Sequence, residues 1–281
     1  MFSTIWNTVF FNPLLNVMII FYHYLGDNLG LAILGIAIIA RIVMIPLVKK
    51  QTGMTKKMAS LKPQLDELQK KYANNKEKLA SEQMKLYKKT GYNPLGCIGT
   101  FIPQLVILSV LIAVIRAVTA SDLDGLYTWV KDLTGISDGI SINTKFLSLE
   151  LTKSYKELSS EFGKFSIESL PYIVLSILVG VVQYFTTVFT QKMQNVTTPK
   201  KETKGKKEGD TMGNMQASMQ KSTMYFLPLI TVFFTISMPA ALGWYWMVQS
   251  LLLVIQYVSL DFDKTKKGIQ NLLDLLHKKE K

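Results

Sequence analysis

Cysteine and histidine are scarce in this chain of 281 residues. Cys97 is the only thiol, so one copy of the chain can hold neither an internal disulfide nor a cysteine zinc cluster. His23 and His277 are the only histidines, and neither lies in a segment that we expect to cross a membrane. An intramembrane enzyme that depends on histidine is therefore disfavoured. We expect no catalysis of bond chemistry, no metal and no cofactor.

The composition is apolar, since 48% of the residues are hydrophobic and the mean hydropathy is +0.21. Together with a net charge of +12, this composition favours a membrane-embedded protein over a basic soluble one. An apolar run from 222 to 260 would form a helix of roughly 58 Å, about twice the hydrocarbon thickness, so we divide it at Met238-Pro239. The sequence then predicts an all-α membrane protein with five transmembrane helices, at 29–48, 97–118, 170–190, 222–238 and 239–260.

The N-terminal segment 1–28 contains one shorter apolar stretch. Asn12 followed by Pro13 is typical of a helix start, and the apolar residues continue to Leu25. A helix of 14 residues is too short to span a bilayer, so we predict an amphipathic helix that lies in the membrane interface. A signal peptide is the alternative, but it needs a positive start and no Lys or Arg precedes Arg41.

Lysine is distributed unevenly among the segments that connect the crossings. The 49–96, 191–221 and 261–281 segments hold 12, 7 and 6 lysines, whereas the 119–169 segment holds 5 and residues 1–28 hold none. With the acidic residues included, the first group carries +14 and the second −4. The positive-inside rule therefore predicts an outside N-terminus, a cytoplasmic C-terminus and an extracytoplasmic 119–169 loop.

The 49–96 segment shows a heptad pattern. Apolar residues spaced by 4, 3, 4, 3 and 4 are Met54, Met58, Leu61, Leu65, Leu68 and Tyr72, and Leu79, Gln83 and Leu86 continue the pattern. With a turn at Ala73-Asn74-Asn75, the pattern predicts an antiparallel helical hairpin over 53–90. Pro63 is expected to kink or restart its first arm. The hairpin is either a mobile contact arm or a solvated spacer, and both interpretations stay open here.

Arg41 lies inside the first predicted crossing, roughly 12 Å from the inner boundary at Lys49. An arginine at such a depth normally faces a partner or water. The five crossings contain no Asp or Glu, so water is the partner that we expect. Gln104 and Gln183 lie at similar depth on two other helices, and Gln249 adds an amide on the last one. These residues indicate a positive, hydrated groove open to the cytoplasm; the alternative is that the amides join helices and Arg41 binds backbone carbonyls.

Three stretches carry a family resemblance: GLAILGIAIIARIVMIPLVKK at 30–50, LKPQLDELQKKYANNKEKLASEQMKLYKKTGYNPLG at 61–96, and FLP at 226–228 with MPAALGWYW at 238–246. In combination they resemble the YidC, Oxa and Albino membrane insertases. The resemblance implies insertion of membrane proteins without ATP, through a groove lined by Arg41, Gln104 and the aromatic pair Tyr245 and Trp246. It also implies a bacterial plasma membrane location.

The same resemblance implies several partners. Nascent membrane proteins are the expected substrates, and the hairpin, the 191–221 loop and the 261–281 tail are candidate ribosome contacts. The Sec translocon and anionic lipids are further candidates. The sequence departs from the family at Ala241 and Ser250, where Gly and Asn are usual, and the acidic 119–169 loop is expected to be a surface insertion.

Two other classes of function were weighed. A small polytopic transporter or channel is disfavoured because the crossings lack carboxylates and the chain lacks two similar halves. An intramembrane protease would require a Ser–His pair or paired Asp within the bilayer, and neither is present there.

Overall fold

The computed structural model describes residues 2–91, 101–136, 142–193 and 211–260. The chain divides into two compact units, which are described separately: residues 1–44, 102–183 and 228–253 form the first, and residues 45–101, 184–227 and 254–281 form the second. Cys97, the 261–281 tail and most of the 191–221 loop lie outside the described residues.

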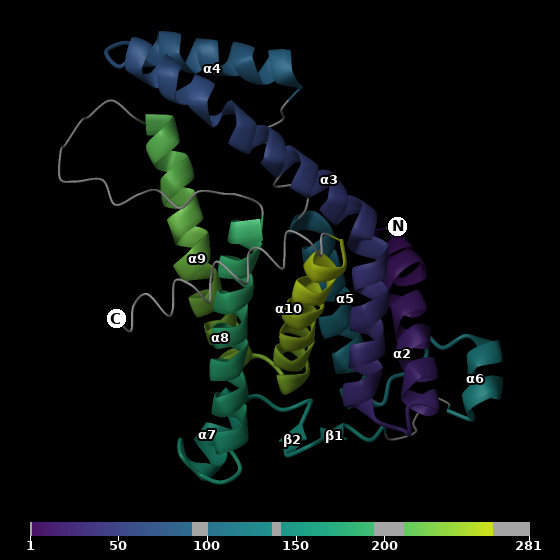
Figure 1. The fold of residues 1–281 in the computed structure, drawn as a ribbon. Coiled ribbons are helices and arrows are strands. Elements are labelled where there is room, and N and C mark those ends of the chain that lie inside the picture. Colours follow the sequence, from purple (N-terminus) through teal and green to yellow (C-terminus); the bar gives the residue numbers. More distant parts are fainter. Residues whose placement is uncertain (1, 92–100, 137–141, 194–210, 261–281) are drawn as a thin grey trace. The chain divides into compact units, whose positions relative to one another are not determined.

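The described chain is almost entirely helical (Figure 1). The elements are α1 (Phe2–Trp6), the π-helical turn η1 (Asn7–Phe11), α2 (Asn12–Tyr24), α3 (Leu29–Lys71), α4 (Lys76–Thr90), α5 (Phe101–Ala120), α6 (Thr128–Thr134), β1 (Lys145–Phe146), β2 (Leu149–Glu150), α7 (Tyr155–Phe162), α8 (Leu170–Met193), α9 (Thr211–Ser237) and α10 (Ala240–Leu260). The strands pair antiparallel, with Lys145 opposite Glu150 and Phe146 opposite Leu149. An all-helical membrane protein is therefore confirmed at this level, with one small β-hairpin added.

The N-terminal helix is longer than the sequence predicts. α1, η1 and α2 follow one another without a break, so helical structure runs from Phe2 to Tyr24 rather than starting at Asn12. The cause is η1, in which the Asn12 N–H bonds to the Asn7 carbonyl immediately before Pro13. A π-helical turn accommodates a proline that an α-helix would reject, because it shifts the hydrogen bonds around the missing N–H. The placement of this helix in the membrane interface stays a prediction, but its length no longer supports that placement.

Four described helical segments are long and apolar enough to cross a membrane: Ser3–Tyr24, Leu29–Lys50, Leu170–Gln191 and Ala240–Ser259. The described apolar parts of α5 and α9, Gln104–Ala120 and Met224–Ser237, are shorter. The chain is thus a multi-pass membrane protein. α9 ends at Ser237 and α10 begins at Ala240, on either side of the Met238-Pro239 break that the sequence indicates.

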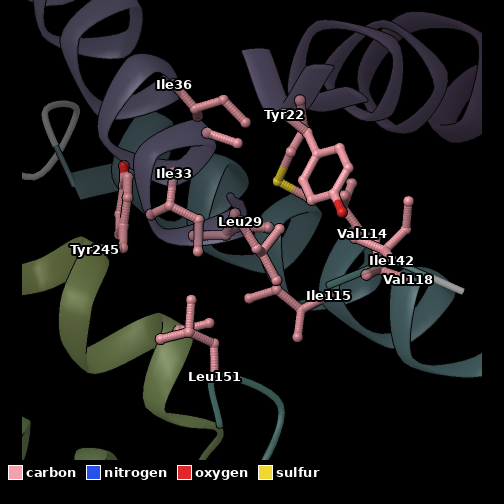
Figure 2. Close-up of a cluster of buried hydrophobic side chains, with 14 of the residues drawn as sticks. Tyr22, Leu29, Ile33, Ile36, Val114, Ile115, Val118, Ile142, Leu151 and Tyr245 are labelled. Carbon is pink, nitrogen blue, oxygen red and sulfur yellow. The ribbon is translucent and has the colours of Figure 1, made fainter. Parts of the chain in front are cut away.

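The first unit has a continuous apolar core. Its buried side chains come from α2, α3, α5, α8, α10 and the 119–169 loop, and Leu15, Ile33, Leu111 and Leu242 are at most 1% exposed. Figure 2 shows Ile33 and Ile36 of α3 on one side of this cluster and Val114 and Ile115 of α5 on the other. Leu151, from the loop, lies in the same cluster.

The second half of the 119–169 loop is packed into this unit, which corrects its interpretation as a surface insertion. Leu151 is completely buried, and the carbonyls of Leu151 and Lys153 accept hydrogen bonds from the N–H groups of Ala241 and Ala240, at 2.9 and 2.8 Å. These donors belong to the first turn of α10, which has no partners of its own for them. The loop therefore caps α10, a role that composition alone did not show.

A close contact at Gly30 joins the β-hairpin to α3. The Phe146 ring packs against Trp244 with centroids 4.8 Å apart, and the Trp244 indole N–H donates to the Gly30 carbonyl at 2.8 Å. A Cβ added at Gly30 would overlap the Phe146 ring. Only glycine at position 30 leaves room for this stack.

We therefore expect Gly30→Ala to lower the free energy of unfolding by about 1–3 kcal/mol, the usual cost of overpacking. Phe146→Leu in the same chain is expected to recover part of this loss because it vacates the space. Thermal unfolding of the purified protein in detergent measures both variants. Equal losses in the single and double variants would contradict the contact.

In the second unit, α4 packs against the end of α3 as a helical hairpin. Leu61 and Leu65 of α3 form a small buried cluster with Tyr87, and Leu86 packs on it. Asn75 caps α4 by accepting from the Lys78 N–H at 2.9 Å, and Gly91 ends it in the left-handed conformation. α3 continues through Pro63. Of the two predicted alternatives the restart is therefore wrong, while the kink stays a prediction. The side chain of Met58 lies outside the described part of the chain.

Tyr87 makes the stability of this hairpin sensitive to high pH. Burial raises the pKa of the Tyr87 hydroxyl, because charge is disfavoured away from water. A raised folded-state pKa favours the neutral form, so we expect full stability below about pH 10, the unfolded value, and a loss as the pH rises through the folded-state pKa. Limited proteolysis between pH 8 and 11 measures this loss, and Tyr87→Phe is expected to abolish the part due to ionisation. An unchanged pH profile in that variant would refute the assignment.

Candidate functional site

Arg41 lies on α3 in the first unit, where its side chain is half-buried. Its guanidinium Nη2 donates to the backbone carbonyl of Gln249 on α10 at 2.6 Å and also to the Gln249 side-chain oxygen Oε1. The five predicted crossings contain no carboxylate, so these amide oxygens take the place of a counter-ion. The expectation that only water solvates Arg41 is therefore wrong. The alternative, in which Arg41 binds backbone carbonyls and the amides join helices, agrees with these contacts. A glutamine oxygen and a helix carbonyl with a second lone pair both accept from a cation.

Gln249 is the hub of this arrangement and is only 5% exposed. Its Nε2 donates to the Ala37 carbonyl at 3.1 Å and to the Tyr245 hydroxyl at 3.2 Å. Because the amide nitrogen is occupied on one side, the oxygen is turned toward Arg41 on the other. Tyr245 and Gln249 are one turn apart on α10, while Ala37 and Arg41 are one turn apart on α3, so two short helical faces meet here.

Gln104 of α5 joins the same cluster through Tyr245. Its side chain shares a hydrogen bond with the Tyr245 hydroxyl, which is completely buried. In Figure 2 Tyr245 extends from α10 to lie beside Ile33 of α3. Three helices thus place polar groups around one phenol. We name the set Arg41, Gln104, Tyr245 and Gln249 the Arg41 cluster.

Gln183 and Trp246 make other contacts. The Ser250 hydroxyl donates to the Gln183 side-chain oxygen at 2.8 Å, which connects α8 to α10 one residue beyond Gln249. The Trp246 ring packs edge-on against Phe234 of α9, with centroids 6.3 Å apart. Gln183 of α8 thus contacts α10 at the residue after Gln249, and Trp246 is the residue after Tyr245. Their role in a groove stays a prediction.

Two contributors escaped the sequence analysis. Ser250 was noted in the sequence only because the family usually has asparagine there. The signal that could have identified it is that it follows Gln249, which gives two polar residues on the same turn of α10. The Ala37 carbonyl has no side-chain signal at all. Only its spacing of four residues before Arg41 places it on the same helical face.

The chemistry of the Arg41 cluster is that of binding rather than bond cleavage. It holds one permanent cation, two amides and a phenol, which are donors and acceptors but no nucleophile paired with a base. Among the residues that the structure describes, no group of three or more His, Cys, Asp or Glu side chains is placed to hold a metal ion. An anionic group is the ligand that such a donor set prefers.

Comparisons with known proteins give several relatives of this chain. Over 257 residues, 90% of this chain, the sequence is 28% identical to "Membrane protein insertase YidC 2" of Bacillus anthracis and covers 79% of that protein. It is 26% identical to the YidC insertase of Buchnera aphidicola over 91% of the chain, but spans only 38% of that longer relative. It is 28% identical to "ALBINO3-like protein 1, chloroplastic" of Arabidopsis thaliana, over 90% of the chain and 47% of the relative.

A family model also matches the chain. The model described as "60Kd inner membrane protein" matches residues 20–267, a range that includes every residue of the Arg41 cluster. This match covers most of the chain, and the chain therefore belongs to the 60Kd inner membrane protein family, the family of the YidC-type insertases.

Proposed function

We propose that the protein is a membrane insertase and chaperone that moves a short polar tail of a nascent membrane protein across the bilayer and releases the adjacent hydrophobic helix sideways into lipid. The observation that carries the proposal is the Arg41 cluster, a cation held by neutral amides inside an apolar bundle. The names of the similar proteins, which are insertases rather than enzymes, support the same function.

Arg41 suits a transient contact with substrate because its present partners are neutral. A hydrogen bond between a charged and a neutral group is weaker than one between opposite charges. A carboxylate about 4 Å from the guanidinium gains roughly 4 kcal/mol at an effective dielectric constant of 20. An acidic tail residue can thus displace the Gln249 oxygen, and Gln249 can take the guanidinium back when the tail has passed.

No fuel is required for short tails. Twenty apolar residues that contribute about −0.4 kcal/mol each supply roughly 8 kcal/mol when the substrate helix enters lipid. That offsets the transfer of two polar residues at about 3 kcal/mol apiece. Longer charged tails are expected to need a further machine, for which a Sec translocon is our candidate.

The groove that we propose is lined by the Arg41 cluster with Gln183 and Trp246 beside it and opens to the cytoplasm. The proposal places the C-terminus in the cytoplasm, because the lysine-rich segments all lie on that side. It keeps five crossings, with the N-terminus outside. If the Ser3–Tyr24 helix also crosses, the N-terminus moves to the cytoplasmic side while the charge balance of the other segments is unchanged.

The hairpin, the 191–221 loop and the 261–281 tail are proposed to contact ribosomes or anionic lipids. Together the 191–221 loop and the tail hold 13 lysines, which attract phosphate groups of either partner. In the hairpin, the polar faces of both arms remain exposed while a small apolar seam is buried. This leaves charged surface available for a partner.

Reconstitution into liposomes tests the proposed function. Purified protein is incorporated into vesicles, a single-span substrate with a short acidic tail is synthesised outside, and protection of its tail from protease is measured. Protein-dependent protection without ATP is the expected result. Solute flux without insertion would instead support the transporter alternative, and cleavage of the substrate would support a protease.

A further inference from the structure

α6 is a short helix in the 119–169 loop whose two sides differ sharply. Val130 and Thr134 are buried, and α6 contacts α2. Residues four apart lie on the same side of a helix, so the exposed surface of α6 has two flanks. Trp129 and Leu133 form an apolar flank and are 56% and 45% exposed. Thr128 and Asp132, which are also exposed, form a polar flank. α6 therefore has a buried back, an apolar flank and a polar flank.

The start of α6 is fixed to α2 by Asn16, which is only 2% exposed. The Asn16 amide donates to the Gly125 carbonyl at 2.9 Å and accepts from the Tyr127 N–H at 2.7 Å. One side chain thus holds both sides of the turn that leads into α6. The Tyr127 ring stacks near Trp129, with centroids 6.4 Å apart, and extends the apolar flank.

This attachment places α6 alongside the apolar helix that contains Asn16 rather than beyond its end. Asn16 lies eight residues before the end of α2, or roughly 12 Å along the helix axis. The helix to which it belongs is apolar over Ser3–Tyr24 and exposes Ile5, Val9 and Phe10. Figure 1 shows α6 beside the half of α2 that precedes α3, not past its end. If that helix crosses the membrane, α6 lies at the level of its lipid-facing surface.

We propose that α6 is a lipid anchor, whose Tyr127, Trp129 and Leu133 insert into the leaflet on the side of the 119–169 loop. Trp and Tyr are enriched at the boundary between headgroups and acyl chains, where an apolar ring and a polar flank are both accommodated. Thr128 and Asp132 then face headgroups and water. The three outward side chains of a seven-residue helix are too small a surface for a stable second copy of the chain, which needs about 800 Å² per partner.

Single cysteines test this proposal, because replacing Cys97 with serine leaves no other thiol. In that background Leu133→Cys and Asp132→Cys are labelled with the environment-sensitive fluorophore NBD, and the protein is reconstituted into phosphatidylcholine and phosphatidylglycerol vesicles. The two positions are adjacent on one helix and differ only in flank. Trp129→Cys gives a second position on the apolar flank if Leu133→Cys folds poorly.

We expect the NBD probe at position 133 to emit at a shorter wavelength than the probe at position 132. A lipid with a nitroxide near the headgroup end of its acyl chain is expected to quench the probe at 133 at least roughly twofold more strongly than the probe at 132. Aqueous iodide is expected to quench mainly the probe at 132. Equal iodide quenching at both positions would overturn the proposal in favour of a water-exposed helix. Short-wavelength emission at 133 without lipid quenching would also overturn it, because a protein partner would then cover the flank.

Discussion

Insertion of a single-span substrate with an acidic tail is expected to slow roughly tenfold to a hundredfold in Arg41→Ala. A hydrogen bond to a charged group is worth about 1.5–3 kcal/mol, and about 1.4 kcal/mol corresponds to a factor of ten. The substitution removes the only cation of the cluster, so the tail carboxylate crosses without a partner. The rate of tail protection in liposomes measures the effect.

Two controls separate this loss from unfolding. Arg41→Lys keeps the charge but not the planar pair of donors, so we expect a smaller loss. In Arg41→Ala, Gln249 retains its bonds to Ala37 and Tyr245, so the helices α3 and α10 stay joined and the thermal unfolding temperature should fall only slightly. Wild-type rates in Arg41→Ala, with a folded protein, would refute a role for the charge.

Gln249→Glu is expected to inhibit insertion of acidic tails about as strongly as removal of Arg41, although it leaves the cation in place. The new carboxylate would occupy the position of the Gln249 oxygen that already accepts from Arg41. An ion pair roughly 4 Å apart gains about 4 kcal/mol at an effective dielectric constant of about 20. A carboxylate fixed at residue 249 makes this pair without the loss of freedom that a substrate carboxylate pays on binding, so it outcompetes the tail. The resulting protein should be folded and inactive toward acidic tails, as measured in the same liposome assay.

Gln249→Leu is the matched variant for this experiment. It also removes the amide, but it adds no competing charge and leaves Arg41 its bond to the backbone carbonyl of residue 249. We expect a loss of several-fold at most, mainly through stability, because the Ala37 carbonyl and the Tyr245 hydroxyl lose a partner at about 1–3 kcal/mol. Equal activity of Gln249→Glu and wild type would show that the Gln249 oxygen is not the position that substrates use.

The helical architecture was accessible from the sequence because long apolar runs and a heptad seam depend on local spacing. Two errors in the helices have local physical causes. η1 lets helical structure run through Asn12-Pro13, and α3 continues through Pro63, so helical structure neither begins at Pro13 nor restarts at Pro63. The packing of the 119–169 loop against α10 was missed because it depends on the backbone carbonyls of Leu151 and Lys153, which any residue supplies.

For the candidate site, polarity and depth singled out residues that the structure brings together, but they did not predict how these residues pair. Arg41, Gln104 and Gln249 were singled out because polar groups in apolar helices are costly. Their mutual contacts depend on the relative rotation of α3, α5 and α10, which no single helix encodes. For that reason Gln183 pairs with Ser250 instead of joining the Arg41 cluster, and Trp246 packs on Phe234.

The coupling between Arg41 and a charge on the substrate tail tests the account most directly. Insertion rates are measured for two substrates that differ only in one tail residue, Asp or Asn, with the wild-type protein and with Arg41→Gln. The account predicts that the wild type favours the Asp tail and that this preference disappears in Arg41→Gln. The same ratio of rates in both proteins would contradict the claim that Arg41 meets the tail during insertion.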